Sequence, residues 1–232
     1  MHWLRHSFAI GFGLLACAVS LITVAQAFPT KPIRIIVTFA AGGTTDILAR
    51  AIAPRLAEVL GQQVIVENRP GAAGVIGADV VAKAPPDGHT LGMFASSHAV
   101  TPFVMKSLPY DPVNDLAAVT LAAIVPGLLT STMSVPATTL KEVLELAKSK
   151  PGYFSFGVPG SLTSGHLSME LLKNLTGVDM VAVPYKGAAP AFMDLISGQL
   201  HFMISSPPSS MPHIKAGKLR PIATTAAKRS SA

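Results

Sequence analysis

The sequence predicts an α/β protein with doubly wound sheets, and two observations support this prediction. Short runs of β-branched and other apolar residues, such as Ile33–Phe39, are typical of buried strands in parallel sheets. Segments whose apolar residues recur at helical spacing alternate with these runs, and the connections are short. The pattern restarts after Leu116, which predicts a second α/β unit with its boundary near residues 122–126.

The first unit follows the order β-α-β-α-β. Thr44, Thr45 and Asp46 can cap a helix that continues to Leu60, and Gly61 can terminate it. The predicted strands are Ile33–Phe39, Gln63–Glu67 and Thr90–Ala95, with a second helix over Ala73–Ala84. Ligands of such sheets bind beyond the carboxyl ends of the strands, which are residues 40–46, 68–74 and 96–98 here.

The second unit contains more strands. They are predicted over Val119–Val125, Leu128–Val135, Phe154–Val158, Met180–Pro184, Gln199–Ser205 and Leu219–Thr224. Helices are predicted over Leu140–Ser149, His166–Thr176, Ala189–Ser197 and Ser209–Ala216.

Residues 1–27 have the features of a cleaved signal peptide. Arg5 lies in a short polar start, Phe8–Val24 carries no charge, and Ala25-Gln26-Ala27 favours cleavage after Ala27. A membrane anchor and lipidation at Cys17 are the alternatives. Cleavage would remove the chain's one cysteine, which excludes disulfides and thiolate metal sites and predicts an exported, periplasmic protein.

Composition and motifs exclude several function classes. The net charge is +6, but aromatic residues make up only 6% of the chain, so we expect no nucleic-acid partner. No Gly-Lys-Ser/Thr phosphate loop, no G-x-G-x-x-G motif and no metal-ligand spacing occurs after the leader, so we expect no cofactor and no metal. A nucleophile elbow is also absent; the enzyme alternative is a hydrolase using Ser164 and His166.

Two glycine-containing loops stand at predicted helix starts, Ala40–Asp46 and Gly160–His166. Free backbone N–H groups and the helix dipole at such positions attract a carboxylate or a phosphate. A plain strand-to-helix turn and simple helix capping are the alternatives for the single loops. One such loop in each unit indicates a ligand site between the units.

Several segments together resemble the periplasmic solute receptors of tripartite tricarboxylate transporters, also called Bug receptors. These segments are KPIRIIVTFAAGGTTDILAR (31–50), LGQQVIVENRPGAAGVIGADVVAKAPPDGHTL (60–91), LPYDPVNDL (108–116), SGHLSMELL (164–172), VPYKGAAPAFMDLISGQL (183–200) and SMPHIKAGKLR (210–220). The resemblance extends along nearly the whole chain after residue 27.

The resemblance implies a hinged, two-lobed type II periplasmic binding protein with mixed sheets, which binds without catalysis. The first lobe would span residues 28–124, the second 125–222, and 223–232 would begin a return to the first lobe. The implied role is capture of a small carboxylate (a di- or tricarboxylate, acidic amino acid or aromatic acid) as a monomer serving a membrane permease. The alternatives are presentation of the ligand to a membrane kinase and a non-functional truncated fragment.

The resemblance and the loop pattern together predict a set of ligand-binding residues. They are Phe39, Ala41, Gly42, Gly43, Thr44, Asp46, Ser96, Ser97, Gly160, Ser161, Thr163, Ser164, His166, Pro184, Tyr185, Lys186, Gly187 and Ser205. Two departures from the family pattern stand out. Leu162 occupies a position where these receptors usually have a small residue, and the sequence stops at Ala232, where relatives continue. We therefore expect an incomplete first lobe with exposed apolar surface.

Overall fold

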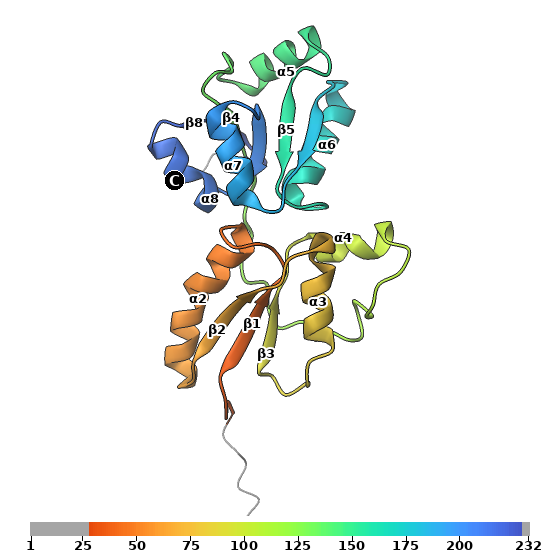
Figure 1. Ribbon diagram of the computed structural model, residues 1–232, viewed down its shortest axis with the longest axis vertical. Coiled ribbons are helices and arrows are strands. Elements are labelled where there is room, and N and C mark those ends of the chain that lie inside the picture. Colours follow the sequence, from red (N-terminus) through yellow and green to blue (C-terminus); the bar gives the residue numbers. More distant parts are fainter. Residues whose placement is uncertain (1–27, 229–232) are drawn as a thin grey trace, which may run out of the picture. The chain divides into compact units, whose positions relative to one another are not determined.

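The structure, a computed structural model, describes residues 28–228 (Figure 1). The predicted leader, its cleavage after Ala27 and residues 229–232 lie outside the described residues. The chain divides into Met1–Thr30 and Lys31–Ala232, and the fold below is that of the second part. We call its three-stranded sheet with the flanking helices the first lobe, and its five-stranded sheet with the flanking helices the second lobe.

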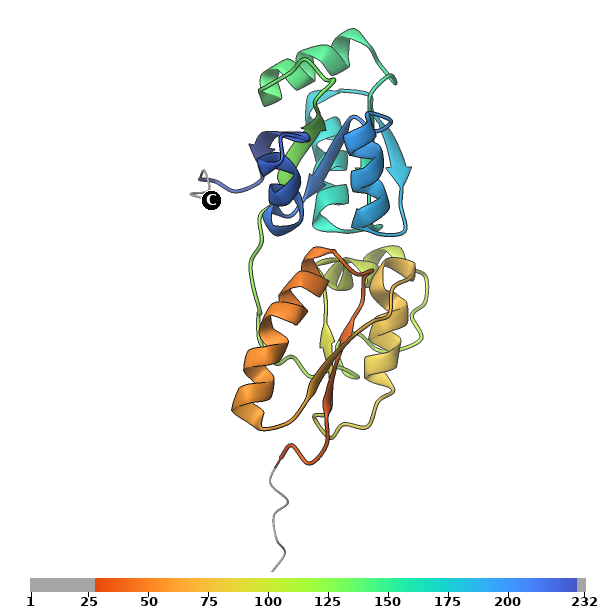
Figure 2. The ribbon, with the colours of Figure 1, turned by 60° about the vertical axis from the view of Figure 1, so that its left-hand side comes forward.

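The first lobe is built on a parallel sheet of order β2-β1-β3. Its elements are β1 (Ile33–Val37), α2 (Thr44–Leu60), β2 (Val64–Asn68), the 3₁₀ turn η1 (Ala72–Gly74), α3 (Val75–Ala82), β3 (Thr90–Met93) and α4 (Ser97–Val104). Helices α2 and α3 flank the sheet on opposite sides (Figures 1 and 2). This arrangement confirms the prediction of a doubly wound parallel unit.

The second lobe has a mixed sheet of order β6-β5-β7-β4-β8. Its elements are β4 (Leu128–Thr132), α5 (Leu140–Ser149), β5 (Ser155–Val158), α6 (Ser164–Thr176), β6 (Val181–Pro184), α7 (Ala188–Ser197), β7 (Phe202–Ser205), α8 (Pro207–Lys215) and β8 (Leu219–Thr224). Strands β5, β6 and β7 are parallel, whereas β4 is antiparallel to both β7 and β8.

Strand β7 shows how the second lobe buries both faces of its sheet. Phe202 and Ile204 pack into a core cluster with residues of α5 and α6, while Met203 packs into a cluster with residues of α7. Successive side chains of a strand point to opposite faces. Strand β7 is therefore covered by helices on both faces, as its continuous apolar sequence predicts.

Several helix ends carry signals in the sequence, but the predicted cap of α2 by Thr44, Thr45 or Asp46 is wrong, because Gly43 is its N-cap and no side chain caps it. Gly61 ends α2 and Gly177 ends α6, both in the left-handed conformation. Thr139 caps α5 through a reciprocal capping box with Glu142. Such signals work because they depend only on the backbone within one helical turn.

Two predictions about elements are wrong. Val119–Val125 forms no strand; Val119 is 78% exposed and Ile124 is 84% exposed. The segment has strand-forming residues, but no strand of residues 28–228 lies beside it to complete a ladder. Helix α4 was missed because Pro102, Thr101 and Ser97 give it weak helical propensity.

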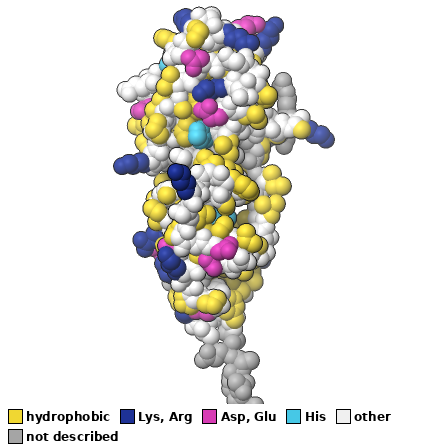
Figure 3. Space-filling view, turned by 90° about the vertical axis from the view of Figure 1, so that its right-hand side faces the viewer, with side chains coloured by type: hydrophobic (Ala, Val, Ile, Leu, Met, Phe, Trp, Pro, Cys, Tyr) yellow, Lys and Arg dark blue, Asp and Glu magenta, His cyan; other side chains and the backbone are white. Residues whose placement is uncertain are grey.

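Charges of both signs lie among hydrophobic side chains on the face seen in Figure 3. This face therefore offers no broad surface of a single charge. Within residues 28–228, no helix is both long enough and apolar enough to cross a membrane.

Candidate functional site

The predicted ligand-binding residues all lie at the carboxyl ends of parallel strands or in the first turn of the helix that follows. In the first lobe they lie between β1 and α2 and between β3 and α4. In the second lobe they lie between β5 and α6, between β6 and α7, and at the end of β7. The topology thus gathers sites that are far apart in the sequence at one edge of each sheet.

Loops of the two lobes approach one another at two glycines. A Cβ atom on Gly160 would lie 2.8 Å from the ring of Phe39. A Cβ atom on Gly187 would lie 2.9 Å from the Cβ of Ala40. The loops after β5 and β6 therefore contact the loop after β1, which supports the prediction that these residues form one site.

The N-terminus of α2 has no side-chain cap. Its N-cap is Gly43, and Gly42 before it has a φ of 79°, a conformation that favours glycine. The first N–H groups of any α-helix lack an intrahelical acceptor. The first N–H groups of α2 are therefore available to an acceptor outside the helix. An anion is a favourable acceptor because the helix dipole is positive at this end.

Asp46, predicted to bind ligand, is engaged by the protein itself. One carboxylate oxygen accepts a hydrogen bond from the Gly42 N–H at 2.9 Å. The other accepts from Arg50 Nε at 2.9 Å and from Asn68 Nδ2 at 3.0 Å. The side chain is only 5% exposed.

These contacts keep Asp46 ionised. Burial alone would raise its pKa, but the hydrogen bonds from Gly42, Arg50 and Asn68 outweigh burial and lower the pKa below the usual value of an aspartate. An ionised carboxylate has no proton to donate to the carboxylate of a ligand, and the two negative charges repel each other. The geometry favours a supporting role for Asp46 over direct contact with an anion.

The loop between β5 and α6 is held by its own residues. Thr163 Oγ1 donates to the Gly160 carbonyl at 2.9 Å and accepts from the His166 N–H at 3.4 Å. His166 Nδ1 accepts from the Leu162 N–H at 3.2 Å. Leu162 has a φ of 60°, a left-handed conformation that is strained for a leucine. Ser161 and Ser164 are exposed in the same loop.

The loop between β6 and α7 is anchored by Tyr185, whose hydroxyl donates to Asp194 at 2.7 Å. Desolvation by burial and this bond to a carboxylate raise the pKa of Tyr185 to about 12. The hydroxyl is thus engaged within α7, while the neighbouring Lys186 and Pro184 are exposed. Lys186 supplies the cationic side chain among the predicted residues.

The serines among the predicted ligand-binding residues differ in exposure and in hydrogen bonding. Ser205 Oγ, at the end of β7, is buried and has no hydrogen-bond partner within residues 28–228. Ser96 is exposed, whereas Ser97 is buried. Buried hydroxyls are nearly always hydrogen-bonded in proteins, so Ser205 has unused capacity for a partner at this edge.

The hydrolase alternative finds no support in the geometry. Among the described residues, the His166 ring accepts a hydrogen bond from the Leu162 N–H, and no hydrogen bond joins it to Ser164. A serine nucleophile needs a base within hydrogen-bond reach.

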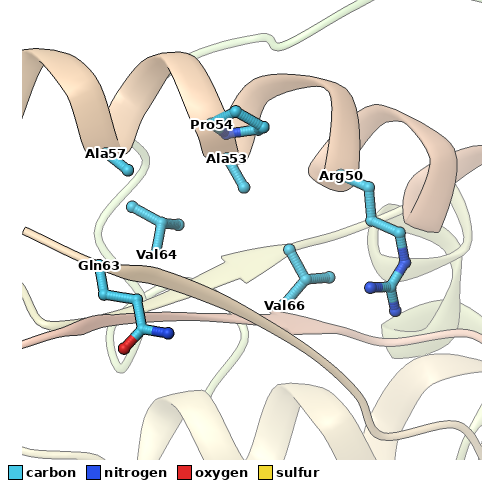
Figure 4. A pocket seen from close by; sticks show the side chains of 7 residues that line it. All are labelled: Arg50, Ala53, Pro54, Ala57, Gln63, Val64 and Val66. Carbon is cyan, nitrogen blue, oxygen red and sulfur yellow. The ribbon is translucent and has the colours of Figure 1, made fainter.

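A pocket lies away from these loops, between α2 and β2 (Figure 4). Its lining is mostly apolar, with Gln63 and Arg50 as the polar side chains; the other residues are Ala53, Pro54, Ala57, Val64 and Val66. Arg50 already bonds Asp46 and Asn68. The pocket therefore lacks a free cation for an acidic ligand.

Three supporting residues were missed from the sequence: Arg50, Asn68 and Asp194. The four-residue spacing of Asp46 and Arg50 is a recognisable helical ion pair. Asn68 and Asp194 carry no such signal, because Asn68 bonds Phe39 and Asp194 bonds Tyr185, and neither spacing is that of a local helical pair.

Comparisons with known proteins identify the family of the chain. The family described as "Tripartite tricarboxylate transporter family receptor" matches residues 48–232. The chain belongs to this family. Its fold is accordingly that of a type II periplasmic binding protein, and the family is one of receptors rather than enzymes.

Individual relatives support the assignment. Protein BugT of Bordetella pertussis is 36% identical over the whole chain, which covers 72% of that protein. Rpa4515 of R. palustris, solved with adipate, is 43% identical with a TM-score of 0.84, over 87% of this chain and 68% of that one. MatC of Rhodopseudomonas palustris, solved with bound malate, is 32% identical with a TM-score of 0.79, over 87% and 69%.

The relatives are longer than this chain. It spans 61% of the length of some of the curated relatives that it matches.

Proposed function

We propose that the chain acts as a periplasmic solute-binding receptor that captures a small dicarboxylate between its two lobes, as a monomer, for the permease of a tripartite tricarboxylate transporter. The proposal includes export through a signal peptide cleaved after Ala27. The approach of the loops after β5 and β6 to the loop after β1 is the observation that carries it.

The electrostatics at these loops suit a dicarboxylate. The uncapped start of α2 supplies N–H donors and a positive dipole end, and Lys186 supplies a positive charge in the second lobe. The start of α7 likewise has no side-chain cap, since its N-cap is Gly187. One carboxylate at each lobe would satisfy these donors and join the lobes.

The ligand class follows from how few cations are available. Arg50 is committed to Asp46 and Asn68, and Phe39 and Leu162 add apolar surface to the loops. A ligand with two carboxylates separated by a carbon chain matches these few positive groups and this apolar surface better than citrate, which carries three charges. Adipate and malate, the ligands named for two relatives, are both dicarboxylates.

The direct test is thermal unfolding of the purified chain with adipate, malate, citrate, glutamate and benzoate. A dicarboxylate at roughly a thousand times its dissociation constant should add about 4 kcal/mol to the free energy of unfolding. The monomethyl ester of adipate is the control, because it keeps the carbon chain and removes one charge. An unfolding midpoint that none of the acids raises would contradict the proposal.

Capture between the lobes predicts a conformational change as well. A ligand that contacts both lobes stabilises the form in which they are closed, by its difference in affinity for the two forms. Small-angle X-ray scattering with and without saturating adipate measures this change. An identical radius of gyration in both states would argue against closure.

A further inference from the structure

Five hydrogen bonds, one of which is also an ion pair, connect the loop after β1 with side chains of α2 and β2. Asp46 in α2 accepts from the Gly42 N–H, from Arg50 and from Asn68. Asn68, the last residue of β2, also donates to the Phe39 carbonyl at 3.0 Å and accepts from Arg50 Nη2 at 3.0 Å. We call Asp46, Arg50 and Asn68 the brace.

The brace fixes both ends of one short turn. Asn68 holds the carbonyl of Phe39 at its start, and Asp46 holds the N–H of Gly42 near its end. Because Asn68 belongs to β2, the turn is tied to the sheet as well as to its own helix. Arg50 completes the set by bonding both other members.

The brace also explains why an acid can stand beside an anion site. The charge of Asp46 is paired with Arg50, and its oxygens are filled by donors from the protein. The N–H groups of the α2 start are left unopposed by a free negative charge. The hydrogen bonds of the brace therefore run to the loop or between its own members.

We propose that Asp46, Asn68 and Arg50 are positioning residues that hold the Phe39–Gly43 loop in its binding conformation before any ligand arrives. The inference rests on the proposed function for the identity of the ligand. It assigns to Asp46 a role through its bond to Gly42, and to Asn68 a role through its bond to Phe39, instead of a direct contact with the ligand.

Asp46→Asn is the sharpest test, because it keeps the size of the side chain. Its amide NH₂ must face either the Gly42 N–H or the donors of Arg50 and Asn68, so one acceptor is lost. We expect adipate to bind about tenfold more weakly. Asp79→Asn is the matched control: Asp79 pairs with Lys83 four residues along α3 and has no bond to the loop.

Amide hydrogen exchange is a second measurement, and it tests whether the loop is fixed when no ligand is present. In the ligand-free chain, we expect the Gly42 amide to be protected from hydrogen exchange and Asp46→Asn to lose that protection, whereas Asp79→Asn keeps it. Asn68→Ala should raise exchange at Gly42 less, because the bond from Gly42 to Asp46 remains. A general loss of stability would instead raise exchange at amides throughout the sheet.

The outcomes separate this inference from the proposed function. Adipate affinity and Gly42 protection unchanged in Asp46→Asn would overturn the brace. If the unaltered chain binds no dicarboxylate, the proposed function fails, and Gly42 exchange alone then decides whether the brace fixes the loop. Weaker binding in Asp79→Asn equal to that in Asp46→Asn would also overturn it.

Discussion

The loop after β1 and the loop after β5 both lead into a helix, yet different interactions hold them. Side chains of α2 and β2, two of them charged, fix the first loop. The second is held by Thr163 and His166 of its own helix start and contains a strained leucine. The first loop thus depends on correct packing of its sheet, while the second depends mainly on its own residues.

The largest expected effect is a difference in the free energy of unfolding between variants of the first loop and of the second. Asp46→Ala leaves donors of Gly42, Arg50 and Asn68 without their acceptor, and loss of bonds to a charged group should cost about 2 kcal/mol of the free energy of unfolding. His166→Ala leaves only the Leu162 N–H without its acceptor and should cost about 1 kcal/mol. Urea denaturation of both variants measures the difference. Equal losses would mean that the two loops are held equally well.

A smaller effect on stability is expected in the loop between β6 and α7, which is held by Tyr185. The pKa of the Tyr185 phenol is about 12 in the folded chain, against about 10 in an unfolded chain. The folded state therefore keeps the phenol proton longer, and the stability from Tyr185 is fully present below about pH 10 and lost as the pH rises through about 12. Tyr185→Phe should remove this pH dependence and cost about 1 kcal/mol at neutral pH.

Denaturant unfolding of both proteins between pH 8 and pH 11 tests this prediction. The Asp194→Asn variant should behave in the same direction, because it removes the charge that holds the phenol neutral. Parallel pH curves for the unaltered chain and Tyr185→Phe would contradict it.

The smallest effect should come from Leu162. Glycine adopts its φ of 60° without strain, so Leu162→Gly should change the free energy of unfolding by less than about 1 kcal/mol. Leu171→Gly, at an exposed helical position of α6, should cost about 1 kcal/mol and is the matched comparison. A larger loss at Leu162 than at Leu171 would show that its side-chain contacts outweigh its backbone strain.

Much of the candidate site was predictable from order along the chain. Gly42 and Gly160 were predicted in loops after strands because parallel sheets present loops at one edge, and the structure has these loops after β1 and β5; Gly187 came from the family resemblance. The role of Asp46 was not predictable. Its position in the first turn of α2 suits a cap or a ligand contact equally well, and only the tertiary structure shows that Gly42, Arg50 and Asn68 occupy its oxygens.

The sequence by itself determined most of the elements and several of their ends. The helix Leu140–Ser149 and the strand Leu219–Thr224 have the predicted bounds, and Gly61 and Gly177 end helices, because these features depend on residues within a few positions of each other. Only the tertiary structure decided that β4 lies antiparallel between β7 and β8, that Val119–Val125 is exposed and that Asn68 holds Phe39. Each of these depends on which distant segments pair, and strand pairing joins residues whose separation no local pattern records.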